Sequence, residues 1–155
     1  MKRFDIITIF PQILDSYFNE SILKRAVDKR LIKIVMHNLR DFAKDRHKKV
    51  DDSPYGGGPG MVLQIQPIKD AIEFVKRKAK ILKRRRVILF STRGKKFDAG
   101  VAKRLSKYDQ LIFICGRYEG VDERVAKYIA DEEISMGDFV LSGGELPAAT
   151  VVEVV

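Results

Sequence analysis

The sequence ICGRYEGVDERV, residues 114–125, joins a short apolar run to glycines and charged residues. A second stretch of this kind, MGDFVLSGGELP, follows closely at residues 136–147. Chains turn sharply at such points and leave backbone N–H groups exposed, because glycine adopts conformations that other residues avoid. Because the two turns follow each other so closely in the chain, we expect both to contact one ligand.

Strand and helix patterns alternate on both sides of these turns. Apolar and β-branched residues predict strands at residues 4–10, 31–39, 87–90, 111–115 and 133–136. Amphipathic or capped segments predict helices at residues 67–79, 98–105, 121–129 and 146–155, one more starting at Pro11, and one capped by Asn19 or Ser21. Residues 43–60 are polar, basic and glycine-rich, which predicts a long loop. The alternation predicts an α/β domain with a mainly parallel sheet flanked by helices.

Ligands of open parallel sheets bind beyond the carboxyl ends of the strands. Three expected strand ends lead into turn-forming residues, at 91–94, 116–120 and 137–144. Any one of them alone is also typical of an ordinary loop between a strand and a helix. Together they predict one ligand site at this edge of the sheet.

The charge of the chain is strongly positive. Its 155 residues, enough for one domain, include 30 Lys and Arg against 21 Asp and Glu, a net charge of +9 with a pI near 9.7. This favours a polyanionic partner such as nucleic acid, although a merely soluble basic protein has the same composition. Two clusters, at residues 40–49 and 76–86, are candidates for phosphate contacts or simply solvated faces.

Other classes of protein find little support. No apolar run approaches the roughly 20 residues that span a bilayer, so we expect no membrane segment. The single cysteine, Cys115, fits a reducing cytoplasm and is expected in the core. No Walker loop, dinucleotide fingerprint or serine-hydrolase elbow is present. His37 and His47 do not have zinc-site spacing, so we expect no structural metal, and His37 is expected at the surface or in packing.

A third stretch, DDSPYGGGPGM at residues 51–61, completes a set of three motifs. In this order and spacing they resemble the bacterial tRNA (guanine-N1)-methyltransferases called TrmD, of the SPOUT class, and the resemblance covers essentially the whole chain. It implies a C-terminal trefoil knot, a homodimer, and transfer of a methyl group from S-adenosylmethionine. The target would be N1 of the guanosine at position 37 of tRNA, 3′ of the anticodon.

The resemblance also assigns site residues. The cofactor contacts fall on Phe90, Ser91, Thr92, Gly116, Tyr118, Glu119, Gly120, Ser135, Met136, Gly137, Asp138, Phe139, Val140, Leu141, Gly143, Gly144 and Pro147. The adenine is expected near Met136, Val140 and Leu141. The target RNA is expected at Arg46, Lys48, Tyr55, Gly57, Gly58, Pro59 and Gly60, where glycines admit a base pulled out of its stack and Tyr55 stacks on a neighbour.

Family members continue beyond the position of Val155 into a second, tRNA-binding domain, which is absent from residues 1–155. The resemblance places the general base in the linker to that domain, so we expect this domain to bind cofactor and dimerise but to methylate poorly. Glu119 and Arg117 are expected to have accessory roles, Glu119 in binding or beside a magnesium ion. Two alternatives remain: a non-catalytic RNA-binding module, and a SPOUT methyltransferase that acts on another RNA.

Overall fold

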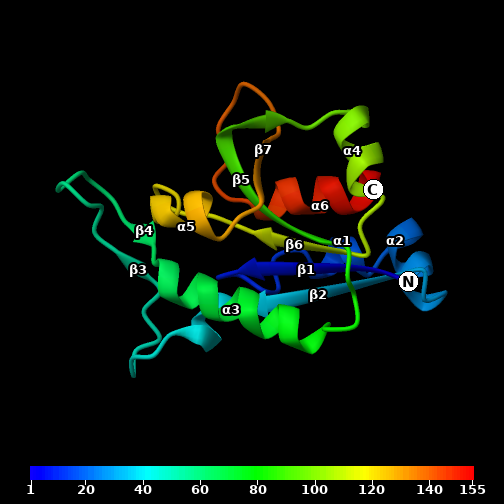
Figure 1. The fold of residues 1–155 in the computed structure, drawn as a ribbon, viewed down its shortest axis with the longest axis horizontal. Helices are drawn as coiled ribbons and strands as arrows, with labels where there is room; N and C mark the ends of the chain where they lie inside the picture. The colour runs from blue at the N-terminus through cyan, green and yellow to red at the C-terminus, as the bar shows by residue number, and fades with distance from the viewer.

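A five-stranded parallel sheet forms the centre of the protein (Figure 1). The computed structural model describes all residues, 1–155. The strands are β1 (Lys2–Thr8), β2 (Ile32–Asn38), β5 (Arg85–Lys96), β6 (Gln110–Ile114) and β7 (Glu132–Ser135). Their order is β2-β1-β6-β5-β7, and every neighbouring pair is parallel. The predicted α/β fold with a mainly parallel sheet is therefore confirmed.

Helices cover both faces of this sheet. One face packs against α1 (Asp15–Phe18), α2 (Ser21–Asp28), α4 (Ala99–Leu105) and α6 (Glu145–Val154). The other face packs against α3 (Ile65–Lys78), α5 (Glu123–Tyr128) and the 3-10 turn η1 (Leu39–Phe42). Side chains alternate between the faces along each strand, so Phe4 and Ile6 belong to the first core and Ile7 to the second. The two cores together fix the sheet between two helical layers.

The ends of several elements agree with the sequence. The side chain of Asp98 caps α4 by accepting a hydrogen bond of 2.8 Å from the Val101 N–H, as predicted. The helix α6 begins directly after Gly144, and α3 covers the expected segment. No helix of the chain combines the length and the apolar character that crossing a membrane requires.

Two predicted helix starts are wrong. Pro11 lies in a turn, where the Ile13 N–H bonds to the Phe10 carbonyl, and α1 begins only at Asp15. The N-cap of α2 is Glu20, without a side-chain cap, rather than Asn19 or Ser21. Asn19 instead donates its side-chain amide to the Asp15 carbonyl and so completes the end of α1.

The expected turn at residues 91–94 is instead part of β5. The pairing of β5 with β7 shifts between Phe90 and Lys95, which both lie opposite Ile134, so the four residues between them form a bulge. Gly94 passes so close to β7 that a Cβ there would lie 2.5 Å from the Ile134 nitrogen. The bulge directs these residues towards the same edge of the sheet that the predicted turn would have reached.

The long polar loop contains a small hairpin that the sequence did not indicate. Its strands are β3 (Asp51–Asp52) and β4 (Val62–Leu63), which pair antiparallel. Leu63 also forms a parallel bridge with Val121, after β6. The hairpin therefore holds the glycine-rich loop at residues 53–60 beside the carboxyl edge of the sheet.

Candidate functional site

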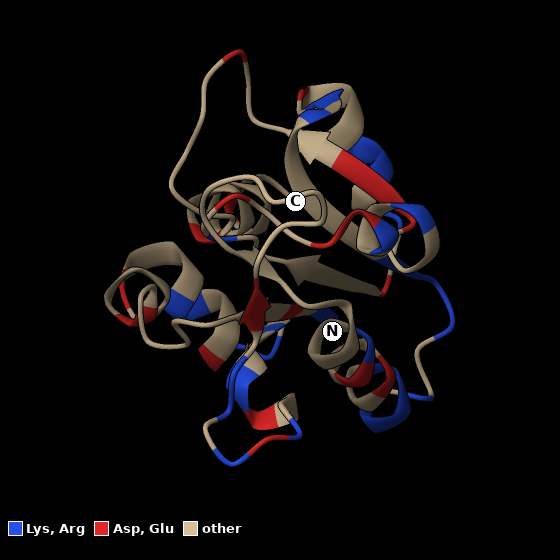
Figure 2. Cartoon of the chain, turned by 90° about the vertical axis from the view of Figure 1, so that its left-hand side faces the viewer, with Lys and Arg blue, Asp and Glu red and all other residues tan.

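A cavity of about 460 Å³ opens at the carboxyl ends of β5, β6 and β7. Its wall is built from the β5 bulge, the loop after β6 and the loop between β7 and α6, which provide residues 89–93, 116–121 and 139–144. Figure 2 looks onto this edge, where the loop between β7 and α6 contains a single charged residue. The three segments that were expected to share a ligand thus share one cavity.

Most of the predicted cofactor residues line this cavity: Phe90, Ser91, Thr92, Gly116, Tyr118, Glu119, Gly120, Ser135, Met136, Phe139, Val140, Leu141, Gly143, Gly144 and Pro147. Arg117 lines it too. Gly137 and Asp138 do not; the Asp138 carboxylate is paired with the Lys96 ammonium at 2.6 Å, outside the cavity.

Further lining residues were not predicted, among them Arg93, Glu123 and Glu133. The Arg93 guanidinium forms ion pairs with both carboxylates, at 2.7 Å to Glu123 and 3.2 Å to Glu133. These partners are 30 and 40 residues from Arg93 in the chain, so no local pattern reveals the cluster. The remaining unpredicted residues are Leu89, Val121, Ala126, Ile134 and Ser142.

Gly144 joins the loop after β6 to the start of α6. Its N–H donates a hydrogen bond of 3.1 Å to the Gly116 carbonyl, and a Cβ on Gly144 would lie 2.7 Å from the Cys115 Cα. Any side chain here would push the two segments apart. Glycine is therefore required for the wall of the cavity to close at this point.

A buried carboxylate supports the same wall. Glu145, the first residue of α6, is 1% exposed and forms an ion pair of 2.9 Å with Arg117. The Arg117 guanidinium also stacks over the Phe10 ring, 4.9 Å from its centroid. Glu145 lies within the second glycine motif, but it was not among the predicted site residues. The sequence signal for it is an acidic residue at the first position of a helix, directly after two glycines.

The cavity offers both polar and apolar contacts to a ligand. The Ser91 hydroxyl is buried and has no hydrogen-bond partner in the protein, and Ser91 lines the cavity, so a rotation of its side chain would let it bond to a bound molecule. The side chains of Phe139, Val140 and Leu141 are 57%, 83% and 39% exposed at the rim, where they form an apolar surface. A ligand with a flat apolar group and several polar groups suits this lining.

The glycine-rich loop reaches the cavity at Glu119. The Glu119 N–H donates a hydrogen bond of 3.0 Å to the Met61 carbonyl, and the Glu119 side chain occupies the space that a Cβ on Gly60 would need. Tyr55 is 90% exposed, and the Arg124 guanidinium lies 5.9 Å from its ring centroid. The structure thus brings two of the three motifs together, with an exposed aromatic ring beside them.

Comparison with known protein families identifies this arrangement. The sequence profile described as "tRNA (Guanine-1)-methyltransferase TrmD" matches residues 1–155. The chain belongs to the TrmD family.

Individual relatives agree with this assignment. The chain is 49% identical over 153 residues to a tRNA (guanine-N(1)-)-methyltransferase of Geobacter sulfurreducens, and 55% identical over 151 residues to one of Clostridium novyi. These matches cover 99% and 97% of the chain but 61% and 60% of the relatives, so the chain spans about 60% of their length.

A solved structure is also similar to the chain. The crystal structure of tRNA (m1G37) methyltransferase from Aquifex aeolicus is 43% identical and has a TM-score of 0.88. The similarity covers 99% of this chain and 68% of that one.

The basic residues that were candidates for contacts with RNA differ in whether they already have partners within the protein. Arg84 is paired with Asp109 at 2.7 Å, Arg86 with Glu132 at 2.8 Å, and Arg85 donates hydrogen bonds to carbonyls at the end of α3. These three guanidinium groups already have partners within the fold, so the residues of the 76–86 cluster without such partners are the stronger candidates for phosphate contacts. Arg46 and Lys48 are exposed, but neither lines the cavity.

No metal centre is evident in the chain. No group of three or more His, Cys, Asp or Glu side chains comes together to hold an ion. Of the three carboxylates lining the cavity, Glu123 and Glu133 are bound to Arg93, and only Glu119 lacks an ion-pair partner. Magnesium usually binds through one or two carboxylates together with waters and ligand oxygens, so Glu119 is the one free carboxylate of the cavity that could hold the ion that the resemblance implied.

Proposed function

We propose that residues 1–155 form the knotted S-adenosylmethionine-binding domain of a tRNA (guanine-N1)-methyltransferase. The whole protein would methylate N1 of the guanosine at position 37 of tRNA, in the cytoplasm and as a homodimer. The observation that supports this most is the single cavity that gathers the three strand ends beside the glycine-rich loop. Family membership and the printed names of the relatives support the choice of reaction and RNA.

The cavity fits S-adenosylmethionine by the chemistry of its lining. The unpaired Ser91 hydroxyl would bond to a polar group of the cofactor, and Met136, Val140 and Leu141 would cover the adenine. The Gly116 N–H, which donates no hydrogen bond to the rest of the backbone, would supply a further donor. When bound, the cofactor supplies an electrophilic methyl group.

The remaining chemistry concerns the proton on guanine N1, which must leave before that nitrogen becomes a good nucleophile. General base catalysis typically contributes about 10²–10⁴-fold to such a step. Glu123 and Glu133 are held by Arg93, and Glu119 is tied through its backbone to the glycine-rich loop. We assign Glu119 and Arg117 to binding and orientation rather than to proton removal, and we expect residues 1–155 alone to methylate tRNA slowly.

The glycine-rich loop is the proposed receptor for the target base. Its residues Gly57, Gly58 and Pro59 are exposed. Its last residue, Gly60, lies against the side chain of Glu119 in the cavity wall. Tyr55 offers an exposed ring for stacking on a neighbouring base. A base inserted between this loop and the cavity would therefore meet the methyl group of the cofactor.

Calorimetric titration of the chain with S-adenosylmethionine tests the cofactor site. We expect saturable binding that Ser91→Ala weakens roughly 3- to 10-fold, the equivalent of one lost hydrogen bond. The Ser91 hydroxyl bonds to nothing in the protein, so this variant should keep its thermal stability. Gly144→Val should abolish binding. Gly58→Val, at an exposed position outside the cavity where a Cβ would approach only Pro54 at 4.0 Å, is the matched control that should bind normally.

The outcomes separate the alternatives. Absence of binding by the folded chain, together with tight RNA binding, would favour a non-catalytic RNA-binding module and overturn the proposal. Binding of S-adenosylmethionine with methylation of a ribosomal RNA fragment, but not of tRNA, would point to a SPOUT methyltransferase with another target. Methylation at guanine N1 of tRNA by the full-length protein would support the proposal as stated.

A further inference from the structure

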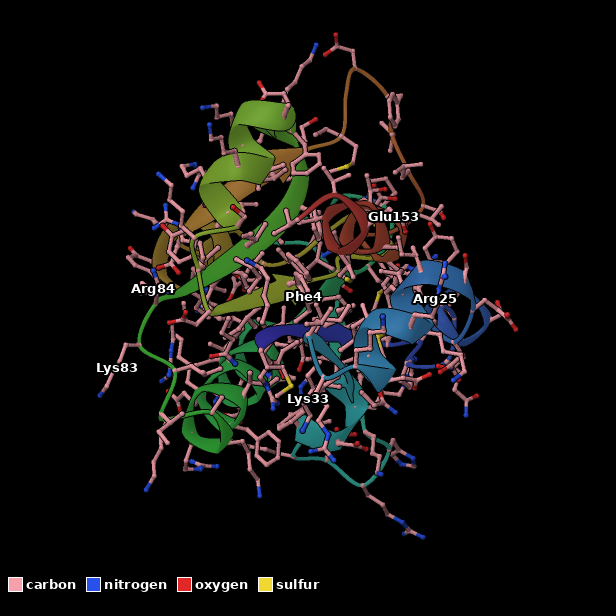
Figure 3. All side chains as sticks on the ribbon, turned by 90° about the vertical axis from the view of Figure 1, so that its right-hand side faces the viewer. Phe4, Arg25, Lys33, Lys83, Arg84 and Glu153 are labelled. Carbon is pink, nitrogen blue, oxygen red and sulfur yellow. The ribbon has the colours of Figure 1, made fainter.

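The edge of the sheet opposite the cavity is strongly basic. In a parallel sheet the amino-terminal ends of all strands lie on the same side. The turns before β2, β5 and β6 therefore lie on the side opposite the cavity, which is at the carboxyl ends. These turns and the start of β2 contribute six exposed cations without any ion-pair partner, which we call the N-edge surface: Lys29, Arg30, Lys33, Lys80, Lys83 and Lys107. Figure 3 looks onto this side, where Lys83 points outward from the loop before β5, next to Arg84.

Backbone hydrogen bonds hold these segments in a row across the sheet. The Leu31 carbonyl accepts from the Lys2 N–H at 3.0 Å, and the Asp109 carbonyl accepts from the Arg3 N–H at 2.9 Å. The Asp109 N–H in turn donates to the Arg84 carbonyl at 2.7 Å. With strands about 4.8 Å apart, the row extends over roughly 15 Å. The segments that carry the N-edge surface therefore lie side by side.

The acidic residues of this edge do not compensate its charge. Asp109 is paired with Arg84 and Asp28 with Lys24, both at 2.7 Å. Glu132 holds Arg86 and Arg104. The cations of the N-edge surface are thus left to repel one another, over distances comparable to the Debye length of about 8 Å at physiological salt. A polyanion would relieve that repulsion and release its own counterions on binding.

We infer that the N-edge surface is a second contact surface for RNA, which binds phosphates of the substrate at a distance from the cavity. The choice of RNA rests on the proposed function. Lysine and arginine side chains bind phosphate oxygens whatever the base sequence, so this surface would position the RNA rather than read its bases. The seven residues of β1 separate the two edges by about 20 Å, so an RNA that touches both must extend well beyond its target loop.

Fluorescence anisotropy with full-length tRNA, over a series of salt concentrations, tests this inference. The double variant Lys80→Glu/Lys83→Glu should bind tRNA at least 10-fold more weakly and lower the salt slope by about 2, or about one for each lost phosphate contact. A control with the same charge change elsewhere, Lys69→Glu/Lys95→Glu, should have a much smaller effect. A hairpin limited to the anticodon arm should bind both variants like the unmodified chain.

Several results would overturn it. Equal weakening by the two double variants would mean a general effect of net charge, and unchanged tRNA affinity would exclude the surface from RNA binding. Loss of binding to phosphatidylglycerol vesicles, with tRNA affinity intact, would indicate a membrane partner instead. The affinity of each variant for S-adenosylmethionine is measured in parallel and should equal that of the unmodified chain. If the unmodified chain does not bind S-adenosylmethionine, that result counts against the proposed function rather than against this surface.

Discussion

The Glu145 carboxylate accepts a hydrogen bond of 2.6 Å from the hydroxyl of Thr8, which lies 137 residues earlier in the chain. Both side chains are buried, and the same carboxylate is paired with Arg117. One acidic group therefore joins the end of β1, the start of α6 and the loop after β6. Because all three segments meet beside the cavity, the stability of the fold and the shape of the site depend on the same contacts.

Replacement of Glu145 by Gln should lower the free energy of unfolding by about 1–3 kcal/mol. The amide keeps the size of the side chain but removes its charge, so Arg117 loses its ionic partner in a buried setting. Urea denaturation measures the effect. Glu153→Gln is the matched control on the same helix; its hydrogen bond with Tyr17 is exposed to solvent, so its loss should change stability very little. Equal effects of the two changes would contradict the role given to Glu145.

Replacement of Gly94 by Val should destabilise the domain by at least about 2 kcal/mol. A Cβ at this position would lie 2.5 Å from the Ile134 backbone nitrogen, so β5 and β7 would have to separate. Thermal unfolding followed by circular dichroism measures the loss. A Cβ at Gly58 would make only an ordinary van der Waals contact with Pro54, at 4.0 Å, so Gly58→Val should shift the melting temperature very little. A native melting temperature for Gly94→Val would mean that the bulge can move without cost.

A buried polar cluster on β1 predicts how stability depends on pH. Asp5 is fully buried and accepts hydrogen bonds of 2.8 Å from both Arg3 and Gln110, and its carboxylate lies 2.8 Å from the His37 ring. Burial raises the pKa of Asp5, but the hydrogen bonds from His37, Arg3 and Gln110 lower it by more, so the pKa lies below its usual value. His37 thus has the packing role expected for it.

A carboxyl group whose pKa is lowered by folding stabilises the protein above its unfolded pKa, about 3.9, and loses that contribution as the pH falls through the folded pKa. We therefore expect nearly constant stability from pH 7 to pH 5 and a decline below about pH 4. The variant Asp5→Asn should be less stable at pH 7 but should decline less between pH 5 and pH 3. Parallel declines in the two proteins, measured by urea denaturation at each pH, would exclude Asp5 as a source of the effect.

The sequence predicted best the features that depend on local patterns. Apolar runs of four to eight residues fixed the strands of the sheet, and the Asp98 cap and the Gly143–Gly144 pair marked two helix starts. Open parallel sheets bind ligands beyond the carboxyl ends of their strands. This rule depends on topology alone, so the order of strands and turns in the sequence predicted most of the residues that line the cavity.

The features that the sequence did not reveal depend on contacts between distant residues. Nothing near Arg93 indicates that it pairs with Glu123 and Glu133, and nothing near Thr8 indicates Glu145. The basic cluster before β5 was similarly ambiguous, because Arg84 and Lys83 look alike in the chain and differ only in whether an acidic residue lies opposite. The knot, the homodimer and the position of the general base stay predictions of the family resemblance.

The buried thiol of Cys115 gives a direct test of how tightly the cavity wall is packed. Burial raises the pKa of Cys115 well above its usual value, and the nearby Glu145 carboxylate raises it further. A thiol reagent needs both access and a thiolate, so the folded chain should react with dithionitrobenzoate at pH 8 at least 100-fold more slowly than the urea-unfolded chain. The variant Glu145→Gln, which loosens the wall, should react faster than the unmodified chain even where both are folded. Rapid labelling of the unmodified folded chain would mean that the wall opens on its own, and that the contacts of Glu145 do not keep the site closed.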